Sequence, residues 1–100
     1  LAERPTIYGE DTFGWALRQA GRPRQALPHA RAAVRPGTRD AVLWYHLAAV
    51  EADLGMTAAA RRHLAEAFAI SPYLTVRDQP AALALAGRLR LPSPSRTSGR

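Results

Sequence analysis

The sequence predicts an all-α fold, an α-solenoid of two helix–turn–helix repeats followed by a C-terminal capping helix. Apolar residues recur at helical spacing from Trp44 to Leu54 and again from Leu64 to Phe68. Gly55 lies between these stretches, where a glycine in the left-handed conformation can end a helix. Small residues take the same places 34 residues earlier, around Gly21. Two amphipathic helices joined at a glycine, and then repeated, indicate stacked hairpins.

The stretch from residue 41 to residue 74 carries a family pattern. It reads AVLWYHLAAVEADLGMTAAARRHLAEAFAISPYL, and its characteristic residues are Trp44, Leu47, Ala48, Gly55, Ala60, Leu64, Ala67 and Pro72. In order and spacing it resembles the tetratricopeptide repeat, a 34-residue helix–turn–helix unit. It departs from the family pattern at Ala48, which stands in place of Gly, and at Glu51, which occupies the aromatic place of the first helix.

Residues 7–40 match the same pattern when the frame is moved back by 34 residues. The small-residue and histidine places are held here by Gly14, Gly21, Ala26, His29 and Ala33. This copy departs at Glu10, which replaces the Trp, and at Pro36, which comes two residues early. We therefore expect repeats at about residues 7–40 and 41–74.

These repeats predict helices at about residues 10–20, 23–35, 40–54, 57–70 and 79–90, within one domain over residues 1–91. Asp40 is suited to cap the third helix, and Pro23 suits a first turn. Pro28 either lies in the first turns of the second helix or kinks it. The helix at 79–90 would cover the apolar face that the last repeat of a solenoid exposes. Residues 92–100 are rich in Ser and Pro, and we expect them to be disordered.

The composition limits the class of protein. All 14 basic residues are Arg, and together with the abundant Ala this is typical of a GC-rich bacterial genome. Of the net charge of +6, the last 13 residues carry +4, so most of the excess lies in a tail that we expect to be solvated. The absence of Cys excludes disulfides and thiolate sites. No apolar run approaches the ~20 residues of a membrane span, and we expect a cytoplasmic protein unless an upstream targeting signal precedes the chain.

No constellation typical of an enzyme, a metal site or a cofactor site is present. His29 and His63 lie one repeat apart on equivalent helices, which are separated by at least ~8–10 Å. Joint ligation of one ion at ~2.0–2.1 Å is therefore not expected, and we interpret both as surface positions. His46 has no carboxylate three or four residues away, and Ser71 lies in a turn before Pro72. We expect no catalytic residue, no metal and no cofactor.

The resemblance implies where a partner would bind. In this family the first helices line a concave groove, and the matching places in this chain are Tyr8, Asp11, Trp15, Arg18 and Gln19, then Val42, Tyr45, Ala49, Ala52 and Asp53. Of these we expect Tyr8, Asp11, Trp15, Arg18, Gln19, Tyr45 and Asp53 to contact the partner.

Helical geometry suggests how Trp15 is oriented. Phe13 and Leu17 are four residues apart and share a core face, whereas Trp15 lies about 200° around the helix from either. We therefore expect Trp15 to point away from the core unless a capping or upstream segment covers it. Glu51 must either reach solvent or meet an Arg, and Arg18 and Arg88 are candidates, because an unpaired buried carboxylate is costly.

The predicted function is protein–protein interaction, as a scaffold or adaptor that holds a peptide or a helix in a concave groove. Because three or more repeats are usually needed for stability, we expect a longer parent protein, self-association, or upstream residues that complete the array. One alternative is nucleic-acid binding through the tail and the basic run of Arg22, Arg24, Arg31, Arg35 and Arg39. Another is a purely structural end cap of a longer solenoid.

Overall fold

The computed structural model describes residues 6–92 and 94, and within them the chain forms five α-helices and no strand. The helices are α1 (Ile7–Gln19), α2 (Pro23–Val34), α3 (Ala41–Asp53), α4 (Thr57–Ile70) and α5 (Gln79–Arg88). The all-α prediction is confirmed, and the largest difference from the predicted bounds is the start of α1. None of these helices combines the length and the apolarity needed to cross a membrane. The tail predicted at residues 92–100 lies, apart from Pro92 and Pro94, outside the described residues.

Local sequence explains where these helices begin and end. Asp40 caps α3 as predicted, because its Oδ1 accepts a hydrogen bond from the Val42 N–H at 3.0 Å. Gly21 and Gly55 follow α1 and α3 with φ of 80° and 76°, a conformation that other residues adopt only under strain. Pro28 lies inside α2, and the helix continues past it to Val34.

The spacing of the helices repeats along the chain. The first residues of α1 and α3 are 34 apart, and so are those of α2 and α4. The glycines after α1 and α3 have the same separation. Each half of residues 7–70 is therefore a helical hairpin of the same design.

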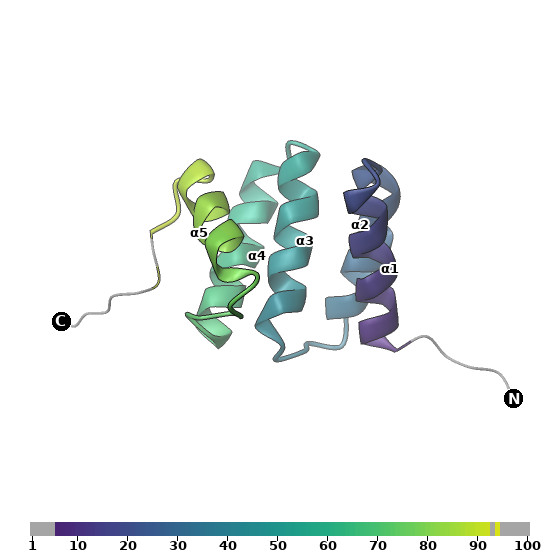
Figure 1. Cartoon of the computed structure of the whole chain (residues 1–100), viewed down its shortest axis with the longest axis horizontal. Coiled ribbons are helices and arrows are strands. Elements are labelled where there is room, and N and C mark those ends of the chain that lie inside the picture. The colour runs from purple at the N-terminus through teal and green to yellow at the C-terminus, as the bar shows by residue number, and fades with distance from the viewer. Residues whose placement is uncertain (1–5, 93, 95–100) are drawn as a thin grey trace, which may run out of the picture.

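The helices pack in two rows. In Figure 1, α1, α3 and α5 lie toward the viewer, and α2 and α4 lie behind them. One apolar cluster joins α3, α4 and α5, and a second joins α2 and α3 with the inner side of α1. Ala26 and Ala60, both fully buried, allow the helices of each hairpin to approach closely. A Cβ on Gly14 would lie 3.1 Å from the Cβ of His29, so α1 and α2 approach closely at this glycine as well.

The predicted orientation of α1 is wrong for two aromatic residues. Phe13 is 54 % exposed and does not lie in the core. Trp15 is half-buried and packs against the cluster that includes α3. The reason is that α2 and α3 cover two sides of α1, and Phe13 lies on a third side that neither of them covers.

Candidate interaction surface

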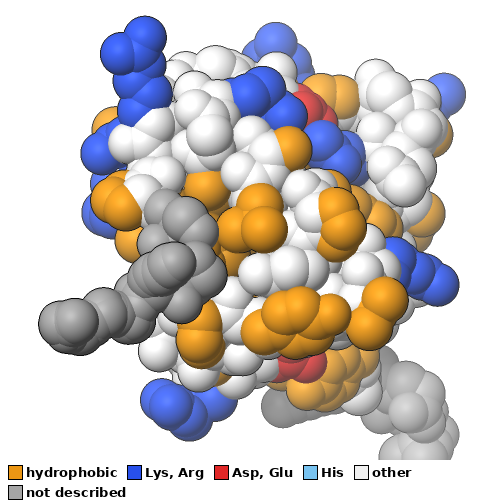
Figure 2. Space-filling model, turned by 60° about the vertical axis from the view of Figure 1, so that its left-hand side comes forward, with side chains coloured by type: hydrophobic (Ala, Val, Ile, Leu, Met, Phe, Trp, Pro, Cys, Tyr) orange, Lys and Arg blue, Asp and Glu red, His pale blue; other side chains and the backbone are white. Residues whose placement is uncertain are grey.

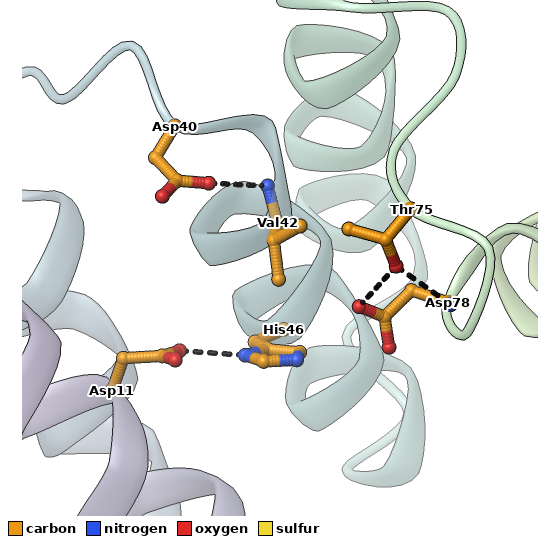
Figure 3. Close-up of polar contacts among 6 residues, drawn as sticks. All are labelled: Asp11, Asp40, Val42, His46, Thr75 and Asp78. Atoms are coloured by element: carbon orange, nitrogen blue, oxygen red, sulfur yellow. Dashed lines mark hydrogen bonds and ion pairs between the residues drawn. The ribbon is translucent and has the colours of Figure 1, made fainter.

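A polar contact joins the first helices of the two hairpins. Asp11 of α1 and His46 of α3 point toward each other, with 2.7 Å between Oδ1 and Nδ1 (Figure 3). Because a carboxylate only accepts, Nδ1 carries the proton and donates it. Both side chains are largely buried, so the contact fixes how α1 and α3 face each other.

Trp15 packs beside this contact, in the region where α1 meets α3, which we call the α1–α3 joint. Its ring stacks on His46, with centroids 3.8 Å apart and planes at 19°, and it lies 5.8 Å from the ring of Tyr45. Arg18 lies on the same helix as Trp15, and its guanidinium is 4.8 Å from the centroid of the Trp15 ring. Trp15 is therefore held between an aromatic neighbour on α3 and a cation on its own helix.

Arg18 also reaches across to α3. Its Nε donates to Oδ2 of Asp53 at 2.6 Å, and its Nη2 donates to Oδ1 at 3.2 Å. Such two-point pairing of a guanidinium with a carboxylate is stronger and more directional than a single contact. Since both side chains keep some exposure to water, we count this ion pair as an aid to orientation more than to stability.

The structure thus places most of the predicted partner-binding residues against one another. Asp11, Trp15, Arg18, Tyr45 and Asp53 meet in the α1–α3 joint. Tyr8 and Gln19 are exposed on α1. Partner binding by these seven residues stays a prediction, but five of them already have partners within the chain.

The prediction that Tyr45 borders an open groove is wrong. Tyr45 is 4 % exposed and belongs to the cluster that joins α3, α4 and α5. Its burial raises its pKa, with Asp78 and Asp53 adding to the rise and the nearby Arg18 and Arg88 opposing it. Ala49 is buried in the same cluster, so these groove places on α3 are covered.

A hollow lies where the first helices of the two hairpins begin. It measures about 460 Å³ and is lined by Tyr8, Thr38, Arg39, Asp40, Ala41, Val42, Ile70, Ser71 and Leu74. The Asp40 carboxylate raises the pKa of Tyr8, chiefly through its negative charge. Tyr8 and Val42 were predicted groove places, whereas Ile70 and Leu74 were missed. The repeat pattern could have pointed to them, because in each hairpin the end of the second helix lies beside the start of the first.

Two further histidines form buried or half-buried pairs within the hairpins. His29 of α2 meets Glu10 of α1 at 2.8 Å, and His63 of α4 meets Glu51 of α3 at 2.7 Å. The interpretation of both histidines as surface positions holds only in part, because their side chains keep 32 % and 24 % of their exposure while each meets a carboxylate of the same hairpin. The expectation that Glu51 meets Arg18 or Arg88 is also wrong, since His63 is its partner.

These two pairs explain why Glu10 and Glu51 depart from the repeat pattern. The Trp44 ring lies 5.7 Å from His63 in the second hairpin, and Glu10 takes the place of Trp44 in the first. Each hairpin therefore supplies one acid to its histidine, but from a different turn of its first helix. Within residues 6–92 and 94, no three His, Asp or Glu side chains gather in a way that would hold a metal ion.

Comparison with models of protein families, with curated proteins and with solved structures finds no match to this chain.

Proposed function

We propose that this chain is a protein-interaction module made of two tetratricopeptide-like repeats, and that it binds an extended peptide segment beside its first helices. The 34-residue spacing of helix starts and of turn glycines supports the repeat assignment. The small residues at the helix crossings support it as well, because Ala26 and Ala60 are equivalent in the frame and both fully buried. In this proposal α5 is the capping helix, since it covers α3 and α4.

The outward side of α5 suits an end cap. Leu83 is the large apolar residue that α5 exposes, and the side chains around it are mostly Ala. Figure 2 shows this side of the molecule, where the apolar side chains form separate patches and Arg side chains lie around them. An interrupted surface of this kind offers a further hairpin little to pack against.

The observation that carries the binding function is the hollow between the starts of α1 and α3. It is bordered by Tyr8 and Val42, two places that face the groove in the family that the sequence resembles. Ile70 and Leu74 provide apolar contacts, and Asp40 provides a carboxylate at the edge. The hollow combines these apolar contacts with polar groups from Thr38, Asp40 and Ser71, and an exposed Tyr at the edge of such a hollow is a typical anchor in protein recognition. The ligand that fits is a peptide with an apolar side chain next to an N–H group that Asp40 can accept from, since Arg39 also lines the hollow and disfavours a cationic group.

Selection from a displayed random-peptide library tests this proposal. We expect enriched peptides to bind the chain and to lose at least about tenfold in affinity on Tyr8→Ala or Val42→Asp. Both variants should fold, because Tyr8 is exposed and an acidic residue is favourable in the first turn of α3. Tyr73→Ala removes an equally exposed Tyr outside the hollow and is the matched control. Failure to enrich any peptide, or equal loss with the control, would contradict the proposal.

A second candidate function, nucleic-acid binding, is favoured by one specific observation. Arg22, Arg24, Arg31, Arg35 and Arg39 are exposed, and none of them forms an ion pair with another described residue. Fluorescence anisotropy with labelled DNA at low and high salt distinguishes the candidates, because binding to phosphates weakens steeply as salt rises. This second function would be favoured if the double variant Arg24→Glu, Arg31→Glu abolished tight DNA binding and Tyr8→Ala left it intact.

A further inference from the structure

One side of α1 is a stripe of exposed small and apolar residues. Gly9, Phe13, Ala16 and Ala20 are spaced by four, three and four residues, so they lie in line along the helix and its C-cap. All four are exposed, and Phe13 is among the most exposed large apolar residues of the described chain. We call this surface the α1 stripe.

The second hairpin shows what such a stripe does. The residues that lie 34 positions later are Leu43, Leu47, Val50 and Leu54 of α3 and its C-cap. They pack in one apolar cluster with α2, against Ala26, Ala30, Ala33 and Val34. The α1 stripe is therefore a helix-packing surface that has no helix on it within the described residues.

The surroundings of the α1 stripe suit a copy of itself. Around Phe13 the charged groups are Glu10 and His29, which are paired with each other, whereas the exposed Arg22 lies two residues beyond Ala20, at the other end of the stripe. Arg24 and Arg31 on α2, and Arg35 at its C-cap, lie at least about 120° around that helix from His29, so they point elsewhere. Two α1 stripes that meet antiparallel around Phe13 thus keep the Arg22 side chains of the two copies at opposite ends and do not place Arg against Arg.

The α1 stripe also carries an exposed aromatic ring and, beside it, a hollow. A hollow of about 300 Å³ beside it is lined by Gly9, Glu10, Phe13 and His29. The Phe13 ring projects at its edge, 4.6 Å from the ring of His29. Gly9, Ala16 and Ala20 have no side chain beyond Cβ, which permits close approach of two helix backbones.

We propose that the α1 stripe is the contact between two copies of this chain. A two-fold axis brings Phe13 of each copy to the hollow of the other, so that one pair of surfaces makes both contacts, as in an isologous dimer. Because Phe13 is the one large side chain of the α1 stripe and its other residues are Gly or Ala, the dimer is weak and reversible. This dimer does not depend on peptide binding at the hollow lined by Tyr8, because Tyr8 lies about 100° around α1 from Gly9 and the two hollows share no lining residue.

Sedimentation equilibrium of the 100-residue chain from about 5 µM to about 500 µM tests the dimer, since this range covers weak specific contacts. We expect a reversible monomer–dimer equilibrium. Phe13→Glu should raise the dissociation constant at least about 30-fold, as truncation of an interface anchor does. Tyr73→Glu, which changes an aromatic residue of matching exposure on another surface, should leave it unchanged.

Gly9→Leu provides a second variant that keeps the fold. A Cβ at Gly9 meets only the Thr6 Oγ1, at an ordinary 3.5 Å, and Leu is a better helix former than Gly. It should retain or raise the melting temperature while its side chain fills the hollow and weakens the dimer. A monomeric wild type at every concentration would overturn the proposal and leave the α1 stripe to a different partner. The proposal would also be overturned if neither Phe13→Glu nor Gly9→Leu weakened the dimer, or if Tyr73→Glu weakened it to the same extent.

Discussion

Removal of His63 should destabilise the protein far more than removal of its counterpart His29. Glu51 is 1 % exposed, and His63 donates to its carboxylate. Removing the partner of a buried carboxylate costs about 3–5 kcal/mol, because the remaining charge stays buried without compensation. The His63 side chain is itself 24 % exposed, so water can enter part of the space that it leaves. We therefore expect His63→Ala to lower the free energy of unfolding by about 2–4 kcal/mol.

The first hairpin contains the matched control. His29 pairs with Glu10, whose side chain keeps 25 % of its exposure and can turn toward water when its partner is gone. His29→Ala should then cost about 1 kcal/mol or less, as for a solvent-accessible pair. A complementary variant is Glu51→Leu, which installs the residue type that Leu17 provides at the same place of the first hairpin. Replacing a buried pair by apolar packing is often neutral or stabilising.

Urea unfolding followed by circular dichroism measures all of these changes. In addition, Glu51→Leu should rescue His63→Ala, since no buried carboxylate remains to be satisfied. Equal losses for His63→Ala and His29→Ala would refute the argument from burial. A loss for Glu51→Leu as large as that for His63→Ala would show that the pair itself, and not the orphaned charge, sets the energy.

Three further changes test the packing of the helices. Trp15→Ala should lower the free energy of unfolding by about 2–4 kcal/mol in the same assay, since it removes a half-buried ring and its stack on His46. The control Tyr73→Ala should change it by no more than about 0.5 kcal/mol. Equal effects would mean that Trp15 does not stabilise the packing of α1 against α3. Ala60→Leu should cost about 1–3 kcal/mol through overpacking between α3 and α4, and a neutral result would remove Ala60 from the helix crossing. Burial raises the pKa of Tyr45 above its usual 10.0, so the stability that its neutral form contributes is present below pH 10 and lost as the pH rises through the higher folded value. The wild type should therefore lose more melting temperature than Tyr45→Phe between about pH 9 and pH 11; parallel losses would contradict this reasoning.

Local features of the sequence were sufficient to predict the helices. Gly21 and Gly55 each adopt a positive φ where a helix ends, and Asp40 caps the next helix. These signals depend only on neighbouring residues, so they can be recognised without knowledge of the packing. The 34-residue frame then predicted which residues are equivalent in the two hairpins.

The partners of individual side chains depend on how the hairpins stack, and the repeat frame does not contain that information. Asp11 meets His46 and Arg18 meets Asp53, both across 35 residues, although the frame repeats every 34. A search for carboxylates three or four residues from His46 could not find a partner on another helix. Glu51 and His63 lie 12 residues apart, across the turn of one hairpin, and they were the pair most accessible to prediction.

Phe13 and Leu47 show why equivalent places have different exposure. They occupy the same place of the repeat, yet Leu47 is fully buried and Phe13 is half-exposed. The difference arises from the neighbour, because Leu47 has α2 to pack against and Phe13 has no described helix on that side. A second copy docked on the α1 stripe would give Phe13 an environment like that of Leu47. The proposed dimer would thus account for an exposed Phe13 at a place that is buried in the second hairpin.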